Sequence, residues 1–303
     1  MIEGEKKCIG LIFGGESNEH DVSVSSARTV FQAFNSEINK QRFTVKAFYI
    51  SKFGNWVDSD LSGKILIGEV ENNITKKQEV FNQEKINFLE GIEFQNVDVW
   101  FPLLHGFNGE DGSIHGLLRF SKKPLIGCGI IGSALGMDKI LMKTIFSNLK
   151  LPQVKYLVFE NEDIDNDEVK NKLINEILKK LNFPVFVKPS NSGSSLGISK
   201  VINESEIPQA LEKARDIDPR ILVEEGLEVR EIECGIIGNS KLLTSEIGEV
   251  KYESDWYDYD SKYYSNNKIT IPAEIDSKIT KEIKEIAIKS CRALNIFGFA
   301  RVD

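Results

Sequence analysis

The first fifty residues carry the pattern that most restricts the fold of this chain. Residues 8–13, Cys-Ile-Gly-Leu-Ile-Phe, form an unbroken apolar run that is typical of a strand covered on both faces. Two glycines follow it, residues 21–34 place apolar side chains at helical spacing, and residues 43–50 read as a second strand. Strands that alternate with helices predict a doubly wound parallel sheet, which binds ligands at the carboxyl ends of its strands.

The chain continues with a polar, weakly periodic stretch over 58–96, which we interpret as a variable segment outside the regular strand-helix pattern. A third strand is expected over 97–104. Three residues with functional potential, Gly15, Glu19 and His105, fall at the carboxyl ends of these strands. The remaining expected elements are strands at 124–130, 154–159, 221–225, 231–238, 241–247 and 297–303, helices at 133–149, 165–181, 205–215 and 276–295, a hairpin at 185–202 and a polar aromatic loop at 251–271.

Composition limits the classes of function. The 303 residues are 41% hydrophobic and 28% charged, which is ordinary for a globular chain of two or three domains. A net charge of −8 gives no support for nonspecific binding to nucleic acid or to anionic membranes. We expect neither partner, and no run of about 18 apolar residues predicts a membrane span. The four cysteines lie far apart, without a CxxC pair, and predict reduced thiols in a cytoplasmic protein.

Residues 185–197, Val-Phe-Val-Lys-Pro-Ser-Asn-Ser-Gly-Ser-Ser-Leu-Gly, combine a strand that ends in one lysine with a Gly/Ser loop. Small residues let backbone N–H groups approach an anion, and Lys188 adds a positive charge beside them. The spacing does not match the common phosphate loop, in which the lysine follows the glycines and a helix begins. From these residues alone, a phosphate clamp and a flexible hairpin loop both remain open.

Several short motifs follow one another in a defined order. They are Gly14-Gly15-Glu16-Ser17-Asn18-Glu19, His105-Gly106 with Gly109-Glu110-Asp111-Gly112, Met137-Asp138-Lys139, Lys188-Pro189-Ser190 with Gly193-Ser194-Ser195, Tyr257-Asp258-Tyr259 with Lys262-Tyr263, and Arg301-Val302-Asp303. Their order and spacing resemble the D-alanine–D-alanine ligases of the ATP-grasp superfamily. The resemblance implies an α/β ATP-grasp fold, with an N-terminal doubly wound parallel-sheet domain over 1–128 and two α+β subdomains, 129–223 and 224–303, that enclose ATP.

The resemblance assigns five residues to ATP. Lys139 and Lys188 would close on the α- and β-phosphates, where two ammonium groups in a partly dry cleft offset the phosphate charge. Glu224 would accept from the adenine amino group, the backbone of Leu227 would contact the adenine ring, and Glu231 would hold the ribose hydroxyls. Without the resemblance, Lys139 is a solvated helix lysine and both glutamates are ordinary surface acids.

The resemblance also assigns residues to the substrates. Glu19, otherwise a residue at a helix N-terminus, would pair with the ammonium group of the first D-alanine. Ser194 and Tyr263 would complete a hydrogen-bonded set with it, and Lys262 would take the carboxylate of the second D-alanine. The other expected substrate-binding residues are His105 and Tyr259. The loop over 251–271 would act as a lid, because an acyl phosphate must be shielded from water.

Arg301 and Asp303 share one face of the last expected strand, since strand side chains alternate. They could form a simple salt bridge. The resemblance implies that Arg301 stabilises the transferring phosphoryl group and the tetrahedral oxyanion, and that Asp303 binds Mg²⁺, with Mn²⁺ as the alternative ion. Related chains continue with a Glu-x-Asn motif that supplies the other metal ligands. We therefore expect the printed chain to be a truncated form that binds magnesium poorly.

The predicted function is the ATP-dependent ligation of two D-alanines through an acyl phosphate, for peptidoglycan precursors, by a homodimer. Three alternatives stay open. The second substrate could be D-lactate or D-serine, although Lys262-Tyr263 argues against D-lactate. An ATP-grasp ligase with unrelated substrates is disfavoured by the Glu19 and His105 motifs. A nucleotide-binding protein without catalysis would fit the missing metal ligands.

Overall fold

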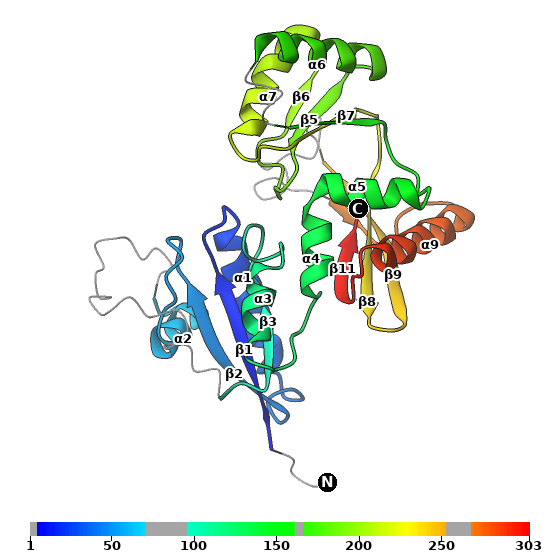
Figure 1. The fold of residues 1–303 in the computed structure, drawn as a ribbon. Helices are drawn as coiled ribbons and strands as arrows, with labels where there is room; N and C mark the ends of the chain where they lie inside the picture. The colour runs from blue at the N-terminus through cyan, green and yellow to red at the C-terminus, as the bar shows by residue number, and fades with distance from the viewer. Residues whose placement is uncertain (1–4, 71–95, 161–165, 253–267) are drawn as a thin grey trace. The chain divides into compact units, whose positions relative to one another are not determined.

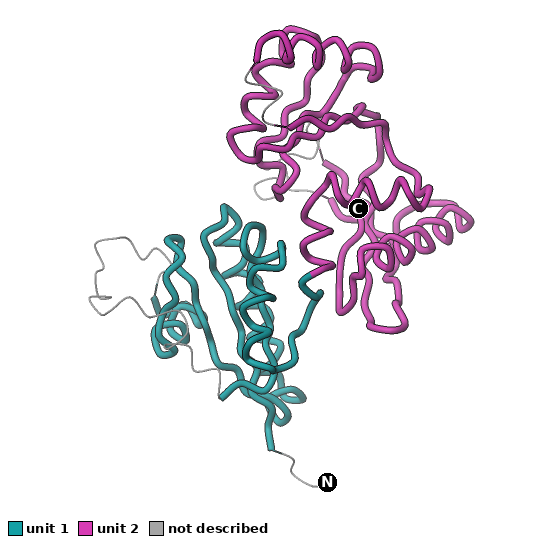
Figure 2. Tube along the Cα trace, in the orientation of Figure 1, with its two compact units in different colours: residues 1–130 teal, residues 131–303 magenta. Residues whose placement is uncertain are grey.

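The computed structural model describes residues 5–70, 96–160, 166–252 and 268–303 (Figure 1). The chain folds as two compact units, residues 1–130 and 131–303 (Figure 2). In the described residues, no helix is long and apolar enough to cross a membrane.

Unit 1 is built on a three-stranded parallel sheet of order β2-β1-β3. Its elements, in chain order, are β1 (Lys7–Gly14), α1 (His20–Phe34), β2 (Phe43–Ile50), α2 (Ser59–Ile67), β3 (Val99–Pro102) and α3 (Ser113–Arg119). Strand β1 occupies the centre and is buried over its last six residues, as its unbroken apolar run predicts. The doubly wound parallel sheet expected from the sequence is confirmed.

Helices cover both faces of this sheet (Figure 1). On one face, Leu11 and Phe13 pack in a core with α1 and α2. On the other face, Ile12 packs with Trp100 and with Ile114 of α3. Successive residues of β1 thus enter opposite cores, which explains why the strand has no polar face. This burial leaves the carboxyl ends of the strands as the positions where polar side chains can gather.

The described residues of unit 2 form two antiparallel sheets of four strands each. The first has the order β4-β7-β5-β6. Its elements are β4 (Tyr156–Phe159), α6 (Asp167–Lys180), β5 (Val185–Pro189), β6 (Ser199–Val201), α7 (Ile207–Arg215) and β7 (Ile221–Glu225). Val185, Val187 and Val223 face a core that includes Ile177 of α6 and Leu211 of α7. Side chains that alternate with these valines therefore project from the opposite face.

The second sheet has the order β10-β9-β8-β11. Its elements are β8 (Glu231–Gly238), β9 (Leu242–Lys251), β10 (Lys268–Thr270), α9 (Ser277–Ala293) and β11 (Gly298–Val302). Cys234 and Ile236 of β8 pack with Ala287 and Cys291 of α9 in one core. The other face of β8 and β11 carries the polar members of both strands. Cys234 and Cys291 are buried free thiols.

Several elements differ from the sequence-based expectation, among them β10, which falls within the loop expected over 251–271. The interval 58–96 contains helix α2, which begins at an Asp58 cap and ends at Gly68 in the left-handed region. The expected helix over 133–149 is two helices, α4 (Ile130–Met137) and α5 (Lys139–Asn148), separated at Asp138. The short strand expected at 124–130 is one bridge from Leu125 to Trp100, and its last expected residue, Ile130, begins α4.

The expected domain boundary at 223 falls inside β7, which continues to Glu225. We propose that unit 2 consists of two subdomains and that the boundary between them lies in the segment between β7 and β8. Each subdomain then contains one four-stranded sheet with its covering helices.

Candidate active site

In unit 1, the expected substrate residues lie together at the carboxyl ends of β1 and β3. Glu19 is the N-cap of α1, but its side chain makes no capping hydrogen bond. A side-chain carbon added to Gly106 would lie 2.7 Å from Oε2 of Glu19. The carboxylate of Glu19 therefore rests against the glycine that follows His105. Gly106 also has φ +68°, and both constraints exclude a larger residue there.

His105 is held by acidic and hydroxyl partners. Its Nδ1 lies 3.6 Å from Oε1 of Glu110, and its Nε2 lies 3.3 Å from Oγ of Ser26. The hydrogen bond with Glu110 raises the pKa of His105 above its ordinary value, against the effect of burial, and the charges of Glu110 and Glu19 add to the rise. The imidazole is therefore protonated more readily than an ordinary histidine, which suits contact with a carboxylate.

Sequence reasoning missed His20, which supports the turn before α1. Its two ring nitrogens contact the carbonyl of Gly15 at 2.6 Å and the hydroxyl of Tyr49 at 2.9 Å. The histidine is 1% exposed, and burial lowers its pKa, so the neutral form holds the turn. Gly14 has φ +91°, and a side-chain carbon there would meet the carbonyl of Ile50 at 2.1 Å. This packing fixes the chain just before Glu19.

In unit 2, Lys139 is attached to the Gly/Ser loop. Its backbone N–H donates to the carbonyl of Ser190 at 3.2 Å, and its Nζ contacts the carbonyls of Ser190 and Ser192. Ser194 and Ser195 both have positive φ, at 47° and 59°. Such conformations cost about 1–3 kcal/mol each and cluster at ligand-binding loops. Lys139 therefore positions this loop in addition to any contact with a ligand.

Unit 2 also contains the Glu224 ion cluster, which consists of Lys143, Glu224 and Lys188. Oε1 of Glu224 lies 2.5 Å from Nζ of Lys143, and Oε2 lies 2.5 Å from Nζ of Lys188. Phe186 pairs with Glu224 and Lys188 with Leu222, so Lys188 and Glu224 are diagonal neighbours on β5 and β7. They project from the sheet face opposite α6 and α7.

The Glu224 ion cluster is only slightly exposed. The exposed fractions of the side chains are 8% for Glu224, 12% for Lys143 and 24% for Lys188. Burial favours the neutral carboxyl, but the charges of Lys188 and Lys143 outweigh it, and the pKa of Glu224 lies below its ordinary value. The carboxylate is thus ionised and can accept from a donor such as an exocyclic amino group.

The remaining expected ATP residues lie on or before β8. Leu227, in the segment between β7 and β8, is 56% exposed. Glu231 begins β8 and shares the face opposite α9 with Glu233, two residues further along. On the neighbouring strand, Arg301 donates to both carboxylate oxygens of Asp303, at 2.7 and 3.1 Å, and its Nε lies 3.4 Å from Glu233. The outer face of β8 and β11 therefore carries a row of carboxylates with one guanidinium group, and the exposed apolar side chains of Ile237 and Phe299 lie further along the same face.

This row does not by itself form a metal centre. Within the described ranges, no group of three or more His, Cys, Asp or Glu side chains is arranged to hold a metal ion. The carboxylate of Asp303, a suitable oxygen ligand for Mg²⁺, is already bridged by Arg301.

Three expected residues, Tyr259, Lys262 and Tyr263, lie outside the described residues. Ser194 is placed in the Gly/Ser loop of unit 2, and Glu19 and His105 are placed in unit 1. The Glu224 ion cluster also includes Lys143, which sequence reasoning missed. The only signal for it is its position four residues after Lys139, one turn further along the same helix.

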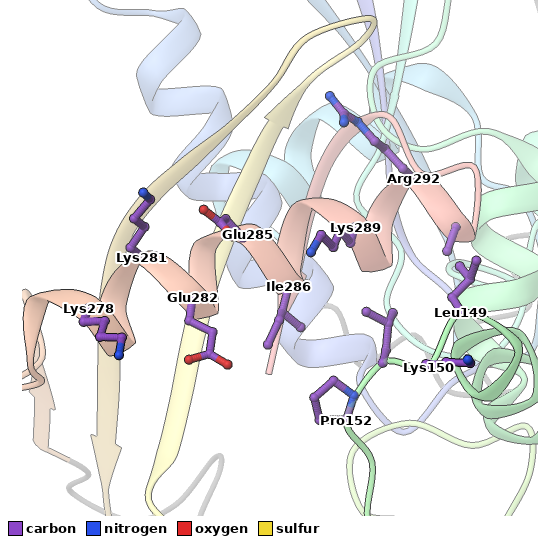
Figure 3. A pocket seen from close by; sticks show the side chains of 12 residues that line it. Leu149, Lys150, Pro152, Lys278, Lys281, Glu282, Glu285, Ile286, Lys289 and Arg292 are labelled. Atoms are coloured by element: carbon purple, nitrogen blue, oxygen red, sulfur yellow. The ribbon is translucent and has the colours of Figure 1, made fainter.

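A separate groove in unit 2 has a volume of about 930 Å³ (Figure 3). One wall is α9, from Lys278 to Ala293, and the other is the segment 149–152 after α5. Figure 3 shows Ile286 of α9 directed toward the side that carries Pro152. None of the residues expected to bind ATP or substrate lines this groove. It is distinct from the Glu224 ion cluster.

Comparison with known proteins places the chain in one class of enzyme. Residues 8–128 match the family described as D-ala D-ala ligase N-terminus, and residues 145–303 match the family described as D-ala D-ala ligase C-terminus. The chain belongs to the D-alanine–D-alanine ligase family.

Individual relatives agree with this assignment. A D-alanine–D-alanine ligase of Prochlorococcus marinus strain MIT 9301 is 84% identical over 303 residues, which are 100% of this chain and 85% of that protein. The crystal structure of the VanG D-Ala:D-Ser ligase from Enterococcus faecalis has a TM-score of 0.77 and 32% identity, and the match covers 98% of this chain and 85% of that one. The D-alanine–D-alanine ligase from Coxiella burnetii also has a TM-score of 0.77, at 25% identity, with 99% and 80% covered. The ATP-grasp fold predicted from the sequence is confirmed.

Proposed function

We propose that this protein is an ATP-dependent ligase that joins two D-alanine molecules into D-alanyl-D-alanine for peptidoglycan synthesis. The observation that carries the proposal is the 84% identity, over the whole chain, to a protein named as a D-alanine–D-alanine ligase. The Glu224 ion cluster supports the nucleotide part of the reaction, because it presents an ionised carboxylate beside two ammonium groups.

The reaction has two steps. A carboxylate oxygen of the first D-alanine attacks the γ-phosphorus of ATP, the bond to the β-phosphate oxygen breaks, and an acyl phosphate and ADP result. The amine of the second D-alanine then attacks the acyl carbon, phosphate leaves, and the amine proton passes to the surrounding solvent. Positioning and electrostatic stabilisation supply most of the rate in such transfers.

The residues of the chain have separate roles in this proposal. Glu19 pairs with the ammonium group of the first D-alanine, and the cationic form of His105 lies by its carboxylate. Lys139 and Lys188 meet the phosphates of ATP, and Arg301 stabilises the charge of the transferring phosphoryl group. Catalytic roles for Ser194 and Tyr263, and substrate contacts of Tyr259 and Lys262, follow from the resemblance to the family.

The nucleotide base and sugar have their own proposed contacts. Glu224 accepts from the adenine amino group, the backbone of Leu227 contacts the adenine ring, and Glu231 holds the ribose hydroxyls. Magnesium, or manganese in its place, would neutralise phosphate charge, with Asp303 as one ligand. We also propose a homodimer in the cytoplasm.

A second candidate product is D-alanyl-D-serine. The structural similarity to the VanG D-Ala:D-Ser ligase, at 32% identity, favours this alternative over unrelated substrates. The two products share the first half-reaction and differ only in the amine that attacks the acyl phosphate.

The test is phosphate release from ATP and magnesium by the purified protein, with D-alanine, L-alanine, D-serine or D-lactate, and with product identification by mass spectrometry. We expect release with D-alanine alone and a D,D-dipeptide as the product. Faster release with added D-serine, with the mixed dipeptide formed, would select the second candidate. A folded protein that binds ATP but releases no phosphate with any of these substrates would overturn the ligase proposal.

A further inference from the structure

The charges of the Glu224 ion cluster do not cancel. Two lysines contribute two positive charges and one glutamate contributes one negative charge, so the cluster carries a net charge of +1. Lys143, Glu224 and Lys188 make no other ion pair in the part of the chain that the structure describes. A chain with a net charge of −8 therefore holds a local positive charge on the sheet face opposite α6 and α7.

Lys143 is the member of the cluster without a role in the proposed reaction. It extends from the second turn of α5 to Glu224, and its Nζ also lies 5.1 Å above the ring centre of Tyr156. A lysine with 12% of its side chain exposed loses much of its hydration, and the carboxylate and the ring offset that loss. The residue is thus fixed in place rather than solvated.

We propose that Lys143 is a positioning residue that shares the charge of Glu224 and thereby leaves one net positive charge, on Lys188, for the phosphates of a nucleotide. Without Lys143, the pair Lys188–Glu224 would be neutral, and its attraction for a polyanion would fall. The carboxylate would also keep Lys188 as its only counter-ion, because a buried ionised carboxylate is costly without one. This inference rests on the proposed ATP-binding role of Lys188 and Glu224.

Inorganic tripolyphosphate is a suitable probe, because it carries the phosphate charge of ATP without a base. Its dissociation constant, measured by calorimetry without added metal, should rise about tenfold in Lys143→Met, as expected for the loss of one nearby charge. The matched control is Lys172→Met on α6, where Lys172 is 71% exposed and pairs with Glu168 at 3.0 Å. The control should bind the probe as the unsubstituted protein does.

A double variant separates this role from a merely structural one. Glu224→Gln removes the negative charge, so Lys143→Met combined with Glu224→Gln again has a net charge of +1. Tripolyphosphate affinity should return to within about threefold of the unsubstituted protein, whereas lost packing around Lys143 would not be repaired. Unchanged affinity in Lys143→Met, or a double variant as weak as the single one, would overturn the inference.

Glu224→Gln alone keeps the inference testable if Lys143→Met does not fold. The Glu224→Gln variant has a net charge of +2 in the cluster. It should bind tripolyphosphate at least about threefold more tightly than the unsubstituted protein does. Equal or weaker binding would contradict the charge-sharing role. ATP binding by the unsubstituted protein distinguishes the two proposals. If ATP does not bind, the proposed function fails; if ATP binds and the variants do not respond, only this inference fails.

Discussion

Ser190 donates its hydroxyl to Oδ1 of Asp138 at 2.8 Å, across 52 residues of sequence. The same carboxylate caps α5 by accepting from the backbone N–H groups of Ile140 and Leu141, and it pairs with Arg220. Burial of Asp138 raises its pKa, but the hydrogen bonds from Leu141, Arg220 and Ser190 outweigh that effect and the pKa lies below the ordinary value. One carboxylate thus connects the start of α5, where Lys139 lies, to the base of the Gly/Ser loop.

Asp138→Ala should destabilise unit 2 by about 2–4 kcal/mol, because it removes a helix cap and leaves Arg220 without its partner. Asp58→Ala is the matched control in unit 1, where Asp58 is exposed and caps α2 with two hydrogen bonds of 3.0 Å. That change should cost only about 1 kcal/mol. Urea unfolding measures both, and equal losses would show that Ser190 and Arg220 add nothing to the cap.

His105 should titrate above its ordinary pKa of 6.5 and His115 below it. Burial is the largest influence on the pKa of His115 and lowers it, whereas the hydrogen bond with Glu110 is the largest influence on the pKa of His105 and raises it. The stability contributed by His105 is complete below pH 6.5 and is lost as the pH rises through its folded-state pKa. NMR titration of the two imidazoles checks the order. Glu110→Gln should lower the midpoint of His105, and an unchanged midpoint would contradict the assigned cause.

Lys188→Met should raise the apparent KM for ATP by about 10- to 100-fold, because a charge-assisted contact with phosphate is lost and Glu224 keeps only Lys143. Steady-state kinetics with saturating D-alanine measures the change, with Lys172→Met as the control. An unchanged KM would remove Lys188 from the proposed nucleotide site.

Tyr263→Phe should weaken closure of the lid and lower the turnover rate with D-alanine. Tyr263 lies outside the described residues, so this expectation comes from the family resemblance. Removal of one hydrogen-bonding hydroxyl is worth about 0.5–1.5 kcal/mol, which corresponds to a rate loss of about 2- to 10-fold. The measurement is phosphate release under saturating substrates, and full activity would exclude the assigned role.

Arg301→Lys should lower kcat by about 100-fold while the free energy of unfolding changes by less than about 1 kcal/mol. Lysine cannot reproduce the two-pronged contact that Arg301 makes with Asp303. An ion pair as exposed as this one contributes little to stability. Arg292→Lys on α9, outside the proposed site, is the control. A large loss of stability would instead assign Arg301 a structural role.

The parallel sheet of unit 1 could be predicted because β1 is apolar without interruption, and only a strand covered on both faces can bury such a sequence. Helix α2 was missed because it has only nine residues and contains Gly63, which weakens the helical signal. The break between α4 and α5 was also missed. Asp138 leaves the helical conformation there to accept hydrogen bonds from residues 140 and 141, and its other partners, Ser190 and Arg220, are remote in sequence.

The sequence by itself determined the order of the motifs, the covered central strand and the family, since each depends on residue types at short spacing. The tertiary structure decided which charges meet. Lys143 is an unremarkable helix lysine in the sequence, and it belongs to the site only because β7 brings Glu224, 81 positions later, within 2.5 Å of it. Ionic contacts between remote residues depend on the packing of whole elements, and no local pattern of residues encodes that distance.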